Sequence, residues 1–161
     1  MAGPHTLAET ERQVEAPLGD LTLDFEAMAV VSNLFRAANA VRNHLERTVL
    51  APADLTWTAF VVLWVVWIWD RVETRTIATE GGFSKATLSG VLTTLENRAL
   101  VERSRSKADG RLVDVSLTAE GRKLMRQLFP KFNAEEREIT RHIDDLGGAA
   151  AMLRALAQAT E

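Results

Sequence analysis

The stretch FSKATLSGVLTTLENRALVERSRSKADGRLVDVSLTAEG, Phe83 to Gly121, decides the fold because its hydrophobic period changes along its length. Its first half has the period of a helix that ends near Arg98, with Ser84 as a candidate N-cap and one apolar face: Leu88, Val91, Leu92 and Leu95. Its second half predicts a short strand over 101–103. A half-buried strand is predicted over 113–117, where Val113, Val115 and Leu117 alternate with Asp114 and Ser116. Asp109-Gly110 lies between the strands and is typical of a hairpin turn.

The residues before this stretch predict three helices. The first begins after Asp24, a candidate N-cap, and has so wide an apolar face that we expect it to pack on a partner as well; Pro52 is expected to end it. The second covers 55–69 and the third 74–80, where Gly81-Gly82 closes it. Residues 1–22 have little periodicity, and we expect a mobile acidic arm with room for a short helix.

The residues after the hairpin predict two further helices. Thr118 is a candidate N-cap for a long helix in which Pro130 predicts a kink, and Gly147-Gly148 is expected to separate it from a last amphipathic helix. The complete order is four helices, a β-hairpin and two helices. This order predicts a mainly α fold with a small β-hairpin wing, of the α+β class, in which a winged helix-turn-helix is flanked by further helices.

Composition excludes several kinds of site. The chain has 161 residues, of which 47% are apolar and 25% charged, as expected for one globular domain or one domain with an extension. It has no cysteine, which excludes disulfides, thiolate metal sites, a cysteine nucleophile and a thiol sensor. Its three histidines, His5, His44 and His142, are far apart in the sequence, so we expect no metal site and no cofactor.

Positive charge is concentrated in one segment. Residues 84–111 contain six basic and three acidic residues, whereas the rest of the chain contains 13 basic and 19 acidic ones. This asymmetry predicts one positive surface on an acidic body. The apolar run from Ala59 to Trp69 is too short to cross a bilayer, which takes roughly 18 residues, and no signal-peptide pattern is present. We therefore expect a cytoplasmic protein without a membrane partner.

The predicted helix and hairpin of this positive segment could contact DNA. The exposed side of the helix would carry small polar residues and one lysine, which allow close approach to base edges: Ser84, Lys85, Thr87, Ser89, Gly90, Thr93 and Thr94. The hairpin carries Arg103, Arg105, Lys107 and Arg111, which suit phosphates and a narrow minor groove, and Asp109 could orient Arg111. The alternative is a polar surface helix beside a solvated charged loop with a weak salt bridge.

The sequence resembles the MarR family of bacterial transcriptional regulators. Phe83 to Arg103 is similar to the family's recognition helix and first wing strand, and Asp109 to Gly121 reproduces the wing pattern of Asp, any residue, Arg, five residues, Leu-Thr and then Gly. The segment LTWTAFVVLW, Leu55 to Trp64, resembles the preceding helix, so that the similarity covers about 65 residues in the correct order. Two positions depart from the family: Gly90 stands where many relatives have arginine, and Ala99 where glycine is usual, so the turn at Ala99 is expected to differ slightly.

The resemblance implies a homodimer that binds double-stranded DNA. The implied regions are 23–54 with 118–161 for dimerisation and 55–117 for the winged DNA-binding domain. Arg111 would enter the minor groove with Asp109 orienting it, and the recognition helices would enter successive major grooves of a pseudo-palindrome, about 34 Å apart.

The resemblance also implies a small aromatic or phenolic ligand between the dimer helices and the winged unit. Candidate ligand-binding residues are Asn39, Arg42, His44, Trp57, Trp64 and Phe129. The simpler interpretation is that the tryptophans belong to the core and that His44 is a structural residue.

The function predicted from the sequence is a transcriptional regulator, more specifically a repressor that such a ligand relieves. No enzyme motif is present, and we predict that the chain is not an enzyme. The alternative is a helical adaptor that uses its basic hairpin to bind an acidic protein.

Overall fold

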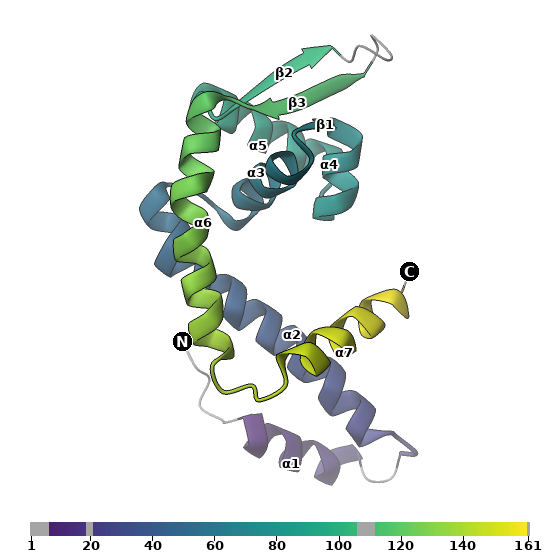
Figure 1. The fold of residues 1–161 in the computed structure, drawn as a ribbon. Helices are drawn as coiled ribbons and strands as arrows, with labels where there is room; N and C mark the ends of the chain where they lie inside the picture. The colour runs from purple at the N-terminus through teal and green to yellow at the C-terminus, as the bar shows by residue number, and fades with distance from the viewer. Residues whose placement is uncertain (1–6, 19–20, 106–111, 161) are drawn as a thin grey trace. The chain divides into compact units, whose positions relative to one another are not determined.

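The computed structural model describes residues 7–18, 21–105 and 112–160. These residues form two compact units, Met1–Asn43 and His44–Glu161, and each is considered by itself (Figure 1). The fold is mainly helical with a small antiparallel sheet, as the sequence predicted.

The first unit consists of α1 (Leu7–Leu18) and most of α2 (Phe25–Leu45), whose last two residues belong to the second unit. The predicted cap of α2 is confirmed, since Asp24 Oδ1 accepts a hydrogen bond from the Ala27 amide at 2.8 Å. A solvent-exposed hydrogen bond joins the two helices, in which Asn33 Nδ2 donates to Glu11 Oε1 at 2.6 Å. The wide apolar face of α2 is also present: Val30, Val31 and Phe35 are exposed, Phe35 by 66%.

The helical path does not end at Pro52. After Leu45 the chain continues as a π-helical turn, Glu46–Leu50, and a 3₁₀ turn, Ala51–Ala53, and Pro52 lies at the start of the latter, where a missing amide proton is tolerated. The next helix, α3 (Trp57–Trp69), begins two residues later than predicted, because Thr56 caps it by accepting from the Ala59 amide at 3.2 Å. Glu46 adds a second acceptor, for the Trp57 amide at 3.1 Å.

The buried helix α3 is the centre of the second unit. Figure 1 shows α4 (Thr74–Gly81), α5 (Lys85–Asn97) and the sheet arranged around it. Six residues of α3 are buried: Ala59, Phe60, Val62, Leu63, Val65 and Val66. In the part of the chain that the structure describes, no single helix is both long and apolar enough to cross a membrane; only the bent pair 25–53 and 57–69 meets that test together.

The sheet has three strands in the order β1-β3-β2, all antiparallel: β1 (Arg71–Glu73), β2 (Val101–Arg105) and β3 (Val113–Leu117). The strand β1 was not predicted, because a three-residue strand is too short for an alternating pattern to be visible. The predicted strand over 101–103 is two residues shorter than β2. The prediction of a half-buried β3 was wrong: Asp114 and Ser116 are each only 7% exposed, because β3 is the central strand and has a paired neighbour at both of its edges.

The long helix α6 (Ala119–Thr140) follows β3 directly. Thr118 caps it as predicted, accepting from the Gly121 amide at 3.0 Å, and Gly121 lies so close to the Leu100 carbonyl that a Cβ there would clash. Pro130 lies within α6, which continues past it to Thr140. The predicted break at Gly147-Gly148 was wrong: α7 (Leu146–Gln158) begins before the glycines, because Asp145 caps it by accepting from the Gly148 amide at 2.8 Å.

Candidate nucleic-acid interface

The helix α5 has one buried and one open face. Leu88, Leu92 and Leu95 anchor it in the core. The predicted DNA-facing residues Ser84, Lys85, Thr87, Ser89, Gly90, Thr93 and Thr94 are all exposed. Ser84 caps the helix as predicted, since its Oγ accepts from the Thr87 amide at 3.1 Å. The structure thus places these seven residues at the surface of a firmly anchored helix.

The hydroxyl groups on this open face are oriented by the helix itself. Thr93 Oγ1 donates to the Ser89 carbonyl at 3.0 Å, and Thr94 Oγ1 donates to the Gly90 carbonyl at 3.1 Å. With their protons engaged, these oxygens keep lone pairs that can accept hydrogen bonds from outside. Nothing lies within 4 Å of a Cβ built on Gly90, so the middle of this face is low and open.

The hairpin begins at the end of α5 with a tight turn. The amides of Ala99 and Leu100 donate to the carbonyls of Glu96 and Leu95 at 2.8 and 2.9 Å. Ala99 has a φ of 53°, in the left-handed region that glycine adopts at low cost. The chain therefore makes a left-handed turn here with alanine.

A second contact fixes the other side of the helix end. Arg98 donates from its guanidinium to the carbonyl of Ala53 at 3.0 Å and to that of Asp54. The end of α5 is thereby tied to the turn that precedes α3.

Two of the predicted hairpin cations lie on β2, and they differ in their surroundings. Arg103 forms an ion pair with Glu96 of α5, and this contact raises the pKa of Arg103 and lowers the pKa of the Glu96 carboxyl below its ordinary value of 4.5. Arg105 is exposed and forms no side-chain hydrogen bond or ion pair with the described part of the chain. Lys107, Asp109 and Arg111 lie outside the described residues.

A groove of about 410 Å³ separates α4, α5 and the hairpin. Four apolar residues line it, Leu88, Leu92, Leu112 and Val113, together with three cations, Arg75, Lys85 and Arg103. Sequence reasoning missed Arg75, although its exposed place on the first helix of a helix-turn-helix is where phosphates pass. The charge of this surface thus extends beyond the predicted segment 84–111.

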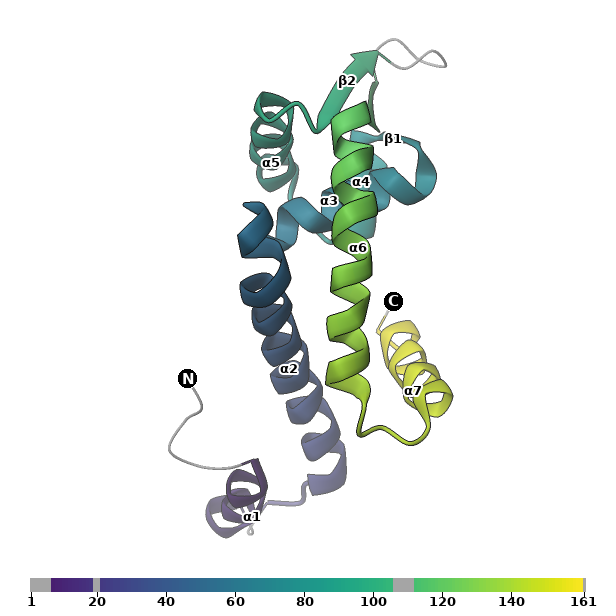
Figure 2. The same ribbon diagram turned by 60° about the vertical axis from the view of Figure 1, so that its left-hand side comes forward.

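The aromatic candidates for ligand binding pack on one another. Trp64 stacks on Phe129 with ring centroids 4.6 Å apart, and Trp57 lies 6.3 Å from Phe132, which itself stacks on Phe60 at 4.4 Å. These rings come from α3 and α6, which lie side by side in both views (Figure 2). Trp64 and Phe129 therefore each have one face occupied by the other ring, and Trp57, Trp64 and Phe129 are all half-buried.

The polar candidates for ligand binding are divided between the two units. His44 lies in the second unit, with Nε2 2.7 Å from Glu135 Oε2. Asn39 and Arg42 lie in the first unit, where Arg42 donates to Asn39 at 3.2 Å. The structure thus joins Trp64 with Phe129 in the second unit and Asn39 with Arg42 in the first.

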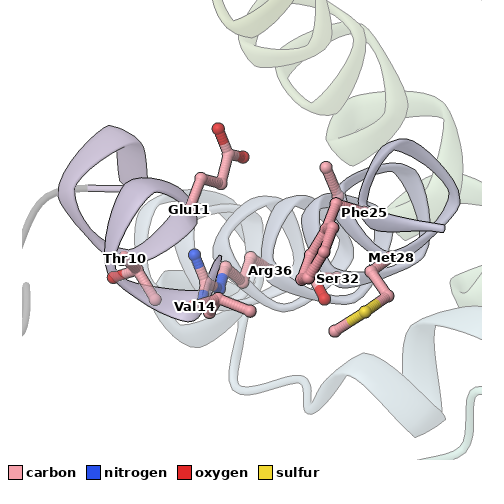
Figure 3. A pocket seen from close by; sticks show the side chains of 8 residues that line it. Thr10, Glu11, Val14, Phe25, Met28, Ser32 and Arg36 are labelled. Atoms are coloured by element: carbon pink, nitrogen blue, oxygen red, sulfur yellow. The ribbon is translucent and has the colours of Figure 1, made fainter. Parts of the chain in front are cut away.

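A separate cavity of about 70 Å³ lies in the first unit, between α1 and α2 (Figure 3). Phe25, Met28 and Arg36 of α2 line it together with Val14 of α1. Among the described residues, no group of three or more His, Asp or Glu side chains is arranged to hold a metal ion.

Comparison with known proteins identifies the family. The model of the MarR family matches residues 55–113, which cover α3, α4, α5 and β2. The chain is 40% identical over 118 residues to the uncharacterised HTH-type transcriptional regulator YwaE of Bacillus subtilis, an alignment that covers 73% of this chain and 69% of YwaE.

Two solved structures have the same fold. The Mycobacterium tuberculosis regulator MosR, determined in complex with DNA, superposes with a TM-score of 0.68 at 26% identity, over 81% of this chain and 94% of MosR. BpsR of Bordetella bronchiseptica, whose DNA binding is regulated by 6-hydroxynicotinic acid, superposes with a TM-score of 0.67 at 25% identity, over 81% of this chain and 98% of BpsR. As the sequence predicted, the chain belongs to the MarR family, whose members are DNA-binding transcriptional regulators and not enzymes.

Proposed function

We propose that the protein is a homodimeric repressor that binds a pseudo-palindromic operator, with α5 in the major groove and the hairpin in the adjacent minor groove. The observation that carries this proposal is the open face of α5, which offers small side chains and Lys85 beside a basic hairpin. A helix with this surface can approach base edges closely, while cations on both sides bind phosphates. The DNA-bound relative MosR has the same fold.

The residues of this surface take different roles in the proposal. Lys85, Arg75 and Arg105 contact phosphates, and Arg111 enters the minor groove with Asp109 orienting it. Ser84, Thr87, Ser89, Thr93 and Thr94 face base edges, where their oxygens accept hydrogen bonds and the threonine methyls can contact thymine. Because Gly90 offers no side chain for a direct base contact, discrimination depends strongly on these hydroxyls and on DNA shape.

Dimerisation uses the helices outside the winged domain, 23–54 and 118–161. Large apolar side chains are exposed on α2 and on α7, which is unusual for a surface that stays in water: Val30, Val31, Phe35, Leu146, Met152 and Leu153. A second copy of the chain would cover them and would place the two recognition helices about 34 Å apart. Regions 1–22 and 55–117 are then the acidic arm and the DNA-binding domain, and the protein acts in the cytoplasm.

A small aromatic or phenolic acid would relieve repression by binding between the dimer helices and the winged domain. The regulation of BpsR by 6-hydroxynicotinic acid supports this class of ligand. In this proposal Trp57, Trp64 and Phe129 contribute ring faces, and Asn39, Arg42 and His44 contribute polar groups. Binding favours a spacing of the two recognition helices that fits only one half-site at a time.

The decisive experiment measures fluorescence anisotropy of the protein with the DNA upstream of its own gene, against competitor DNA and over a salt series. We expect tight binding that resists competitor, and Arg111→Ala is expected to weaken binding and flatten the salt dependence. Titration with 6-hydroxynicotinic acid and related aromatic acids then tests relief. Absence of binding to any duplex at low salt would contradict the proposal and favour the adaptor.

A further inference from the structure

We propose that Glu96 is a positioning residue that holds the wing against the recognition helix, and that Arg103 serves this ion pair instead of contacting DNA. The inference rests on the proposed function, because it assigns a role within the same interface. In this proposal, Arg103 forms an ion pair within the protein, and the other cations of the hairpin remain available to bind DNA.

The ion pair joins two elements that are each anchored in the core. Glu96 follows Leu95, which is fully buried, and Arg103 lies opposite Val115 of the central strand, which is fully buried as well. The Glu96 and Arg103 side chains are 30% and 32% exposed, so the pair lies at the edge of the core. Because both backbones are already fixed, closing the pair orders only the two side chains. The lowered pKa of Glu96 and the raised pKa of Arg103 have this contact as their main cause.

Positioning matters because the helix and the wing contact neighbouring grooves of one duplex. β1 pairs with β3 only at residues 114–116, so that beyond this point β2 and β3 are paired only with each other. A two-stranded ribbon has little stability of its own and can twist about its base. In Figure 1 the hairpin of β2 and β3 extends away from α3, α4 and α5. Arg103 lies opposite Val115, which also pairs with Val72 of β1, so the ion pair with Glu96 acts on the part of the hairpin that still belongs to the three-stranded sheet.

Arg105 provides the contrast. It lies two residues after Arg103 and therefore on the same face of β2, and it is exposed without an ion-pair partner in the described chain. Arg105 can turn towards a phosphate without leaving a partner in the described chain, whereas Arg103 would first have to leave Glu96.

The two possible roles of Arg103 predict opposite effects of removing the Glu96 charge. If Arg103 contacts a phosphate, Glu96→Gln frees the guanidinium, adds net positive charge, tightens DNA binding and steepens the salt dependence. If the pair positions the wing, Glu96→Gln weakens binding despite the added positive charge, and the salt dependence stays unchanged because the number of phosphate contacts is the same.

The test uses a duplex selected from a random-sequence library by the wild-type protein. Anisotropy is measured from low to high salt for Glu96→Gln, for Arg103→Gln and for the exchange of the pair, Glu96→Arg with Arg103→Glu, which preserves net charge. The matched control is Glu102→Gln, which makes the same charge change on the neighbouring strand residue, whose Oε1 accepts from Ser116 Oγ at 3.1 Å. Thermal unfolding of each variant shows that it is folded.

We expect each single variant to weaken binding about threefold per half-site, or about tenfold for the dimer, at an unchanged salt slope. The exchange is expected to recover most of this loss, and Glu102→Gln is expected to show no such loss. Tighter binding by Glu96→Gln, wild-type affinity in both single variants, or a fall in salt slope of about one per half-site in Arg103→Gln would overturn the inference. Failure of the wild-type protein to select any duplex would instead refute the proposed function.

Discussion

Replacing Gly90 by alanine is expected to change the stability of the protein and its affinity for DNA in opposite directions. No atom lies within 4 Å of the added Cβ, so the methyl group meets neither a clash nor a new contact. The remaining effect is the helix propensity, which favours alanine over glycine by about 0.5–1 kcal/mol. For a chain of this size, that corresponds to a rise in thermal midpoint of about 1–4 °C.

DNA binding is expected to change in the opposite direction. In the proposed complex, the missing side chain would let the helix backbone approach the major groove closely at Gly90, and a methyl group there would disturb the fit. A misplaced contact at a base edge costs about 1–3 kcal/mol, which corresponds to roughly tenfold weaker binding or more. Binding to unrelated DNA depends on phosphates and is expected to stay the same.

The assay combines thermal unfolding with anisotropy on operator and competitor duplexes. Gly147→Ala is the matched control, because it replaces an exposed helical glycine of α7, where the nearest side-chain atom is Asp145 Oδ1 at 3.5 Å from the new Cβ. A lower thermal midpoint in Gly90→Ala would refute the open surface at this position. Unchanged operator affinity in a stabilised variant would refute the close approach of α5.

Three further predictions concern how the recognition helix and the wing are held. Gly121→Ala is expected to destabilise the protein by about 1–3 kcal/mol in denaturant unfolding, because its Cβ would clash with the Leu100 carbonyl; wild-type stability would contradict that close approach. Arg98→Ala is expected to cost about 0.5–1.5 kcal/mol, because it removes the donor to the partly exposed carbonyls of Ala53 and Asp54, and Arg98→Lys should recover part of this loss. The pKa of Glu96 is lowered in the folded protein, so its pair with Arg103 stabilises the fold above pH 4.5 and is lost as the pH falls through the lowered value. Glu96 becomes protonated over a range of about pH 6 to pH 3, and over this range the thermal midpoint of Glu96→Gln should therefore fall less than that of the wild type. Equal falls in the two proteins would show that the ion pair adds no stability.

Most of the winged domain was predictable because its signals are local. Ser84 and Thr118 were predicted as caps, and each accepts from an amide three residues later, a contact that depends only on neighbouring residues. The alternation in 113–117 likewise identified β3. The strand β1 could not be predicted, since its three residues pair only with a segment more than forty residues away. The burial of Asp114 was missed for the same reason, because it depends on β1 being present.

The candidate site was predicted in its composition but not in its internal contacts. The exposed face of α5 follows from helical periodicity, and all seven of its predicted residues are exposed. Helical periodicity does not predict the partner of Arg103. Glu96 lies seven residues earlier, and a helix end and a turn separate the two residues, so their contact depends on the path of the chain through that turn. Arg75 lies outside the segment in which positive charge is concentrated along the sequence, and only the three-dimensional arrangement places it beside Lys85.

The left-handed alanine between α5 and β2 has a consequence for the way the sequence can change. An L-residue with a side chain at such a φ costs roughly 1–2 kcal/mol more than in the right-handed region, and glycine largely avoids that cost. Alanine and glycine codons differ by one base. A version of the protein without this cost is therefore one nucleotide substitution away, at the turn between the recognition helix and the wing, where the freer backbone of glycine would alter how the two adapt to different operators.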